Sequence, residues 1–264
     1  EALNAADRLT SPMLKRNGAW QEVDWSTALE FVSSELARVR STHGADALGA
    51  LATPQATLEE LFLLGKLVRG LGASNVDFRL RQADFSLDGQ LRGAPWLGMR
   101  VSEIAGLDRI LLVGSTLRKE QPLLAHRLRL AVRRGAQCNL INPVDDDLLM
   151  RVANKAIVAP SMMPGTLAQI VKAAAQIKSI AVPAGAAHAR VDDAARNMAQ
   201  NLIDGQNRAI LLGNLANHHR QAGELHRLSQ ELARIIDARV GLFGDGANSV
   251  GGYLAGALPD GGKR

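Results

Sequence analysis

The sequence predicts an α/β protein built around parallel strands, and three observations support this fold class. Hydrophobic residues make up 47% of the 264 residues and aromatic residues only 3%, and alanine, leucine and glycine dominate. This composition favours layered helices and strands over an aromatic-rich β-sandwich. Short apolar runs alternate with amphipathic helical patterns along the chain. Residues 109–141 read as a complete strand–helix–strand crossover, which requires two parallel strands.

The N-terminal part is expected to contain a linker and one long helix. Residues 1–17 read as irregular, with a turn at Arg16-Asn17-Gly18 between short extended pieces. Asp24 can cap the helix that follows, and Gly44 ends it. The apolar residues at helical spacing on one face of this helix are Leu29, Val32, Leu36 and Val39.

A strand–helix unit is expected next. The apolar run Ala47–Leu51 predicts a short buried strand, and Thr57-Leu-Glu-Glu60 is a capping box. The box opens a helix that ends at Gly72. Residues 75–100 carry scattered charge, glycine and proline, so we expect them to wind across the surface.

The ends of the strands and of the helix in the crossover are clear in the sequence. Arg109–Val113 predicts a buried strand, and Gly114 opens a tight turn. A helix from Pro122 to Arg134 follows, and the second strand runs from Gln137 to Ile141. The crossover is expected to be right-handed, as such connections are.

The remainder repeats this alternation. Residues 155–158 predict a strand, Thr166-Leu-Ala-Gln169 predicts a capped helix to about residue 178, and residues 208–212 predict a strand that ends at Gly213-Asn214. The helix after it carries on one side Leu225, Leu228, Leu232 and Ile235. The similar endings at residues 109–114 and 208–213 indicate either an internal duplication or the general way in which α/β strands end.

Composition excludes several classes of protein. The single cysteine, Cys138, forbids an internal disulfide and any cysteine-ligated zinc or iron–sulfur site built from this segment alone. The longest uncharged stretch, residues 156–171, is interrupted by proline and glycine and is no membrane span. The 31 basic and 26 acidic residues give a modest net charge of +5. Because Glu1 is no initiator methionine, we read the chain as a piece of a longer one.

Isolated motifs give weaker signals. Residues 244–249 half-resemble a dinucleotide-binding fingerprint but lack its third glycine. Asp145-Asp146-Asp147 follows a strand and could bind magnesium, although such acids more often cap a following helix. His218, His219 and His226 are expected on one helix, where solvated histidines are favoured over a metal site.

Basic residues concentrate between residues 118 and 134. They are Arg118, Lys119, Arg127, Arg129, Arg133 and Arg134. Nucleic-acid binding would call for stacking aromatic side chains nearby, and this stretch has none. A solvated or partner-facing surface is therefore the preferred interpretation.

Three stretches together resemble the molybdopterin-oxidoreductase family. Ala6 to Leu14, Gly18-Ala-Trp20 and Asp24 to Leu29 look like the opening of that family, just downstream of its cysteine-bound iron–sulfur module. Leu112 to Arg129 resembles the large iron–sulfur subunit of bacterial respiratory NADH:quinone oxidoreductase (complex I). The end, residues 246–259, is similar to the family's asparagine/glycine segment.

The resemblance implies a domain organisation. It predicts two Rossmann-like α/β domains of the formate dehydrogenase/DMSO reductase type, one inserted in the other. Residues 18–95 and 240–264 would form the first domain, which would be incomplete, and residues 96–239 the inserted second domain. Residues 1–17 would link them to the iron–sulfur module.

Departures from the family's pattern bear on the cofactor. Active relatives hold two pterin dinucleotides at strand ends, where the turn corresponding to Gly114 typically reads glycine-x-asparagine-proline; here it reads Gly-Ser-Thr-Leu. Residues 79–86, where a metal ligand would fall, offer only Ser86 as a weak candidate, and Cys138 lies in an expected buried strand. We therefore expect no catalytic residue, metal or cofactor in this segment. The candidates for a vestigial pocket are Gly114, Ser115, Asn214 and Asn248.

The preferred hypothesis is a scaffold. The segment would shield the electron-transfer arm of complex I and contact other peripheral-arm subunits, with 2Fe-2S and 4Fe-4S clusters in the upstream part of the chain. It would lie on the cytoplasmic side of the inner membrane, without membrane insertion or nucleic-acid binding. The alternatives are a molybdopterin-dependent oxidoreductase such as a formate dehydrogenase, marked by bound molybdenum or tungsten, and a nucleic-acid-binding protein, marked by salt-sensitive retention of DNA.

Overall fold

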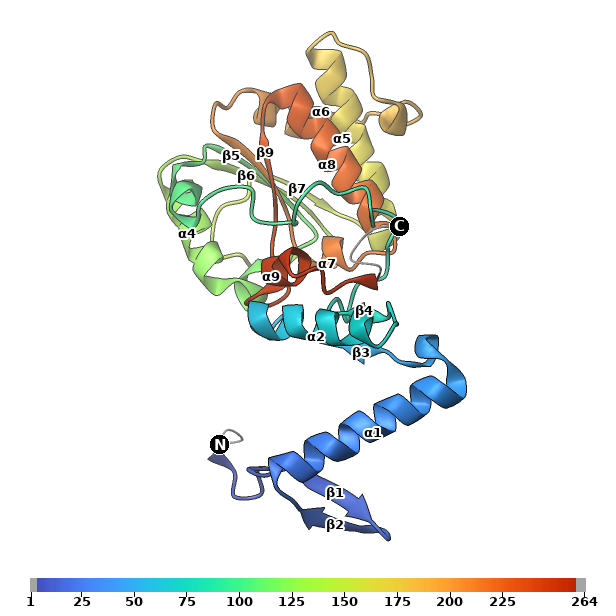
Figure 1. The fold of residues 1–264 in the computed structure, drawn as a ribbon. Coiled ribbons are helices and arrows are strands. Elements are labelled where there is room, and N and C mark those ends of the chain that lie inside the picture. The colour runs from blue at the N-terminus through green and yellow to red at the C-terminus, as the bar shows by residue number, and fades with distance from the viewer. Residues whose placement is uncertain (1–3, 260–264) are drawn as a thin grey trace.

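A computed structural model describes residues 4–259 (Figure 1). The chain forms a body around a parallel sheet, a smaller module beside it and an N-terminal arm that projects away from both. Residues 1–3 of the expected linker and residues 260–264 of the expected first domain lie outside the described residues. No helix in the described range is both long enough and apolar enough to cross a membrane.

The arm consists of a β-hairpin and one long helix. Strands β1 (Met13–Arg16) and β2 (Ala19–Glu22) pair antiparallel around Asn17 and Gly18, which both have positive φ, as such tight turns require. Helix α1 (Trp25–His43) begins at Asp24, whose carboxylate accepts the Thr27 N–H at 2.7 Å, and ends at Gly44. Among the described residues, nothing buries any α1 side chain completely. The predicted cap and stop are confirmed.

The smaller module joins distant parts of the chain. Its strands β3 (Ala50–Leu51) and β4 (Val76–Asp77) pair in parallel. The strand expected over residues 47–51 is therefore only two residues long, Ala50 and Leu51. The Thr57–Glu60 capping box opens α2 (Leu58–Gly70) as predicted. Helix α9 (Ser249–Leu254) packs against α2, and the Arg69 guanidinium donates to the Gly256 and Leu258 carbonyls.

The body contains five parallel strands in the order β7-β6-β5-β8-β9. They are β5 (Arg109–Val113), β6 (Gln137–Asn142), β7 (Asn154–Ile157), β8 (Arg208–Leu212) and β9 (Arg239–Leu242). The chain adds strands outward from β5 through β6 to β7, then returns to the other side of β5 for β8 and β9. The order therefore reverses between β5 and β8, and such a switch point is where open α/β sheets bind ligands.

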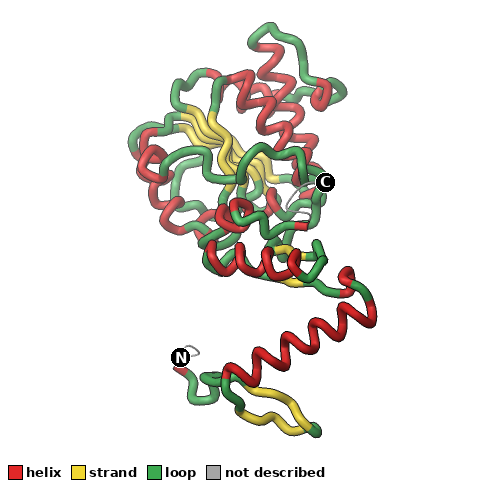
Figure 2. Tube along the Cα trace, in the orientation of Figure 1, coloured by secondary structure: helices red, strands yellow, loops and turns green. Residues whose placement is uncertain are grey.

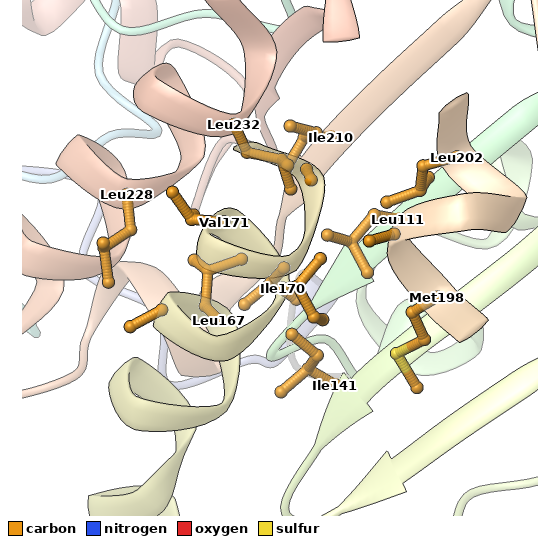
Figure 3. Packing of buried hydrophobic residues seen from close by; sticks show 14 of the residues in the cluster. Leu111, Ile141, Leu167, Ile170, Val171, Met198, Leu202, Ile210, Leu228 and Leu232 are labelled. Atoms are coloured by element: carbon orange, nitrogen blue, oxygen red, sulfur yellow. The ribbon is translucent and has the colours of Figure 1, made fainter. Parts of the chain in front are cut away.

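Helices cover both faces of this sheet. Helices α5 (Met163–Ile177), α6 (Asp193–Ile203) and α8 (Ala222–Ile236) pack on one face (Figure 3), where the strands contribute Leu111, Ile141 and Ile210. Helix α4 (Pro122–Arg133) and a 3₁₀ segment, Val101–Gly106, cover the other face, where the strands contribute Ile110, Leu112, Cys138, Leu140 and Leu211. Both faces are buried, which is why these strands read as continuous apolar runs.

Two helices differ from the sequence expectation. Helix α5 begins at Met163 rather than at a cap on Thr166, whose hydroxyl instead donates to the Met162 carbonyl at 3.0 Å. Pro164 suits the first turn because a first-turn N–H has no partner to lose. Helix α6 was not predicted at all, although Asp192 caps it by accepting the Ala195 N–H at 2.7 Å.

The edge of the sheet at β9 is covered by the chain itself. Residues 78–100 form no helix or strand (Figure 2), yet their end runs beside β9. The Leu242 N–H donates to the Trp96 carbonyl at 2.9 Å. A Cβ on Gly98 or Gly241 would overlap the opposing backbone, so glycine permits this close approach.

The remaining short elements are α3 (Leu117–Glu120), α7 (Asn214–Asn217) and 3₁₀ turns at Ala45–Ala47, Pro160–Met162 and Ala184–Ala186.

Candidate functional site

At the switch point, the turns that follow β5 and β8 lie in direct contact. The Gly213 N–H donates to the Val113 carbonyl at 2.9 Å, and the Ala216 N–H donates to the Gly114 carbonyl at 3.1 Å. A Cβ on Gly213 would overlap Ser115, and one on Gly114 would collide with the Ala216 backbone. Glycine at these positions therefore lets the two turns close on each other.

The Ser115 backbone amide points to a protein acceptor rather than to open space. It donates to Asn142 Oδ1 at 2.9 Å, and the Asn142 amide nitrogen donates to the Val144 carbonyl at 2.7 Å. Ser115 and Asn142 are each only 1% exposed. The N–H that a strand-end ligand would use is thus already bonded below the surface.

Two polar atoms of the switch point have no hydrogen-bond partner among the described residues. They are the Ser115 hydroxyl and the Asn214 side-chain oxygen, both buried. Such an atom typically costs about 1–3 kcal/mol of stability. Neither atom is accessible to solvent in this arrangement.

The four vestigial-pocket candidates do not form one group. Gly114, Ser115 and Asn214 meet at the switch point. Asn248 instead belongs to the smaller module, where its side chain donates to the Ala56 carbonyl at 2.9 Å and its N–H to the Pro54 carbonyl at 2.8 Å. That the three share a sheet edge agrees with parallel strands; the role of all four as pocket residues stays a prediction.

A cavity of about 480 Å³ lies beside the switch point, between the sheet and the smaller module. Its walls come from the end of β9, the end of α7, the starts of α4 and α8, α9 and the loop of residues 78–100. Most of the lining is apolar, with Leu87, Leu91, Trp96, Leu123, Phe243 and Val250 among its residues. No local sequence pattern predicts this cavity, because its walls are far apart in the chain.

Ion pairs fix one wall of this cavity. Arg79 contacts Asp77 at 2.8 Å and Asp88 at 2.6 Å, and its side chain is only 4% exposed. Although burial opposes its charge, the two carboxylates raise the pKa of Arg79 above its ordinary value. The two pairs connect the loop of residues 78–100 to β4. Because both carboxylates already contact the Arg79 guanidinium, Arg79 is poorly available to bind an anionic ligand.

The other carboxylates of the cavity also have partners. Asp84 accepts the Gly223 N–H at 2.8 Å, at the start of α8, and the Ser86 N–H at 2.9 Å. Partial burial opposes the charge of Asp84, but these two N–H donors lower its pKa below the ordinary value. Asp245 lies 3.8 Å from Arg81 and 3.5 Å from His218 Nε2.

The histidines are not on one helix, so that prediction is wrong. His218 and His219 occupy the turn between α7 and α8, and only His226 lies on α8. His219 Nε2 lies 2.9 Å from the Pro160 carbonyl, and its Nδ1 accepts the Gln221 N–H at 3.0 Å. No group of three metal-ligating side chains forms within residues 4–259.

The structure places Cys138 and Ser86 in different surroundings. Cys138 is fully buried in β6, and burial raises the pKa of its thiol to about 12, so it is no thiolate at neutral pH. Ser86 lies against the start of α8, where a Cβ on Gly223 would overlap its hydroxyl. It does not line the main cavity.

The acidic motif forms local ion pairs, whereas three arginines of the basic cluster form none with the described residues. No helix follows Asp145-Asp146-Asp147, so these acids are not caps; Asp145 pairs with Lys155 at 2.7 Å, and Asp147 lies 3.8 Å from Arg118. Arg127, Arg133 and Arg134 form no ion pair with any described residue. The half-fingerprint at residues 244–249 connects β9 to α9, and its Gly246 N–H donates to Ser249 Oγ.

A family model described as molybdopterin oxidoreductase matches residues 8–258. A putative formate dehydrogenase of Staphylococcus aureus (strain USA300) is 30% identical over 139 residues, which are 51% of this chain and 14% of that protein. The assimilatory nitrate reductase catalytic subunit of Bacillus subtilis (strain 168) is 32% identical over 147 residues, 54% of this chain and 21% of that protein. The matched region is thus a small part of these relatives.

Solved structures share the fold. Acetylene hydratase from Pelobacter acetylenicus superposes with a TM-score of 0.64 at 14% identity, over 88% of this chain and 36% of that one. A chain of the formyltransferase/hydrolase complex from Methylorubrum extorquens superposes with a TM-score of 0.57 at 17% identity, over 88% and 60%. These likenesses confirm the α/β parallel-sheet fold class predicted from the sequence.

Proposed function

This chain belongs to the molybdopterin oxidoreductase family, and we propose that its residues 4–259 act as a cofactor-free scaffold in an electron-transferring oxidoreductase. The closed switch point carries this proposal. The turns after β5 and β8 touch through Gly213 and Ser115, and Asn142 takes the Ser115 N–H. The space directly between these two turns is therefore occupied by the chain's own atoms.

The residues present do not fit a molybdenum–pterin group. A pterin dinucleotide carries phosphates, which call for free N–H donors or cations. At the switch point the N–H groups of Ser115, Gly213 and Ala216 are used within the protein. The cavity's two arginines, Arg79 and Arg81, face three aspartates. The cavity lining in the described part of the chain contains no cysteine to hold a metal.

A scaffold can support electron transfer without chemistry of its own. Tunnelling depends on the spacing of redox centres, and a rigid domain fixes that spacing. The body supplies rigidity through two apolar layers on one sheet, and burying each leucine or isoleucine contributes about 1.5–3 kcal/mol. The redox centres themselves would be iron–sulfur clusters, held elsewhere in the full-length protein.

The finer proposal is that this oxidoreductase is complex I, with this chain in its large iron–sulfur subunit. Its support is the resemblance of residues 112–129, which form the switch-point turn and most of α4. The unpaired arginines of α4 would then face other peripheral-arm subunits, because a cationic surface suits an acidic partner. The complex would be peripheral to the cytoplasmic side of the membrane.

A second candidate is a molybdopterin-dependent oxidoreductase of the formate dehydrogenase type. The names of the relatives, formate dehydrogenase and nitrate reductase, agree with this candidate better than with complex I. In that case residues outside this segment would have to supply the cations and the metal ligand, and the switch-point turns would have to separate.

Metal and pterin analysis of the full-length protein separates the two candidates. The scaffold proposal expects iron and acid-labile sulfide without molybdenum, tungsten or extractable pterin, and no formate-dependent reduction of a viologen dye. Molybdenum or tungsten near one atom per chain would overturn it in favour of the enzyme. Co-purification with NADH:quinone reductase activity, lost when the gene is deleted, tests the complex I assignment.

A further inference from the structure

The cavity beside the switch point is not used by the scaffold role. Its volume of about 480 Å³ falls within the range of small-molecule pockets, roughly 300–1,000 Å³. It is also distinct from the switch point, since neither Ser115 nor Asn214 lines it. A ligand could therefore occupy the cavity while the two turns stay closed.

The charged groups of the cavity are paired within the protein, and its two arginines are outnumbered by three aspartates. Arg79 is paired with Asp77 and Asp88, and Asp245 with Arg81 and His218. Asp84 is satisfied by two backbone N–H groups. A charged ligand would have to give up hydration without gaining an unpaired counter-charge, which is costly in an apolar site.

Apolar side chains at the rim remain exposed. Trp96 is 52% exposed, Val101 44%, Val250 38% and Leu123 80%. All four line the cavity. A ligand that covers them would bury apolar surface that the described residues leave in water.

A few polar atoms remain free to orient a ligand. The Gln121 amide nitrogen donates to the Gly244 carbonyl at 2.8 Å, and the Asn217 amide nitrogen to the Phe243 carbonyl at 3.0 Å. Each amide thereby turns its oxygen, an acceptor with no donor among the described residues, away from that carbonyl. His226 also lines the cavity, and burial lowers its pKa, so its ring is neutral at pH 7.

We propose that this cavity binds an uncharged, ring-bearing small molecule, held by apolar contact with Trp96, Leu123 and Val250 and oriented by a hydrogen bond to Gln121 or Asn217. The proposal does not depend on the scaffold role, because it concerns a different set of residues. It predicts selectivity by charge: a neutral ring system binds, and an anion of similar size is rejected.

Dye binding to the full-length protein tests this selectivity. Nile red, a neutral fused-ring dye, is expected to bind at one saturable site per chain and anilinonaphthalene sulfonate, an anion, at least about tenfold more weakly. Equal or tighter binding of the anion, or no saturable Nile red site, would overturn the proposal. Metal analysis is unaffected by either result, so failure here leaves the scaffold proposal standing.

Two variants locate the site. Ala222→Trp fills the cavity from the start of α8, and Val250→Lys places a cation in it. Ala222→Trp should abolish the Nile red site, and Val250→Lys should weaken Nile red about tenfold while strengthening the anion. Val144→Lys is the matched control, because Val144 is 53% exposed and lies outside the lining. Unchanged Nile red binding in Ala222→Trp, with thermal unfolding as a check of folding, would refute the location.

Discussion

The switch point and the cavity lie at the same end of the sheet but are built in opposite ways. At the switch point, glycine lets two backbone turns touch, and polar atoms are sealed inside. At the cavity, large apolar side chains and paired charges line an open space between the sheet and the smaller module. One end of the same sheet therefore holds both a closed contact between two turns and an open cavity.

The largest effect is expected where the contact is closest. Gly213→Ala adds a Cβ that overlaps Ser115 and the Gly114 carbonyl, so we expect the free energy of unfolding to fall by about 3 kcal/mol. Urea unfolding followed by circular dichroism measures it. Gly165→Ala, in α5 with open space around its Cβ, is the control and should be neutral or stabilising. Equal behaviour of the two variants would mean that the turns are not in contact.

The cavity wall should be about as sensitive. Arg79→Met leaves Asp77 and Asp88 without their shared cation, and breaking such a largely buried pair costs roughly 3 kcal/mol. Limited proteolysis should then cut residues 79–97 faster, since the loop loses its tie to β4. Adding Asp88→Asn should restore part of the resistance. Arg38→Met, in an exposed pair with Glu35, should change nothing measurable.

A smaller and opposite effect is expected from Ser115→Ala. The hydroxyl it removes is buried without a partner among the described residues, so the variant should gain about 1 kcal/mol in unfolding free energy. Thermal unfolding under identical buffer conditions is a sufficient measurement. A loss of stability would show that the hydroxyl is hydrogen-bonded in solution, and the switch point would then be less tightly closed than its backbone contacts indicate.

The smallest effect concerns pH at the cavity. Burial lowers the pKa of His226 from its ordinary value of 6.5, so the folded state takes up its proton at lower pH than the unfolded state. The stability from keeping this ring neutral is complete above pH 6.5 and is lost as pH falls below it toward the folded-state pKa. In the His226→Gln variant, the free energy of unfolding should depend less on pH in that window, by less than about 1 kcal/mol in total. At pH 8 its pH dependence should be unchanged.

The central strands could be predicted from the sequence, and the cavity could not. The bounds of β5 and β8 match the expectation because an apolar run buried on both faces ends abruptly at glycine. Helix α6 was missed although Asp192 and the spacing of Ala195, Met198 and Leu202 signal it. The hydrogen bond from Gly223 to Asp84, 139 residues away, has no local signature, because only the folded chain brings these residues together.

Trp96 belongs to two structures at once. Its side chain lines the cavity, and its carbonyl accepts the Leu242 N–H on the outer strand of the sheet. That amide can exchange its hydrogen with solvent only when residues 96–98 leave the strand. A molecule bound in the cavity that holds Trp96 in place will therefore slow deuterium uptake at the Leu242 amide. The rate of that uptake measures whether the cavity is occupied.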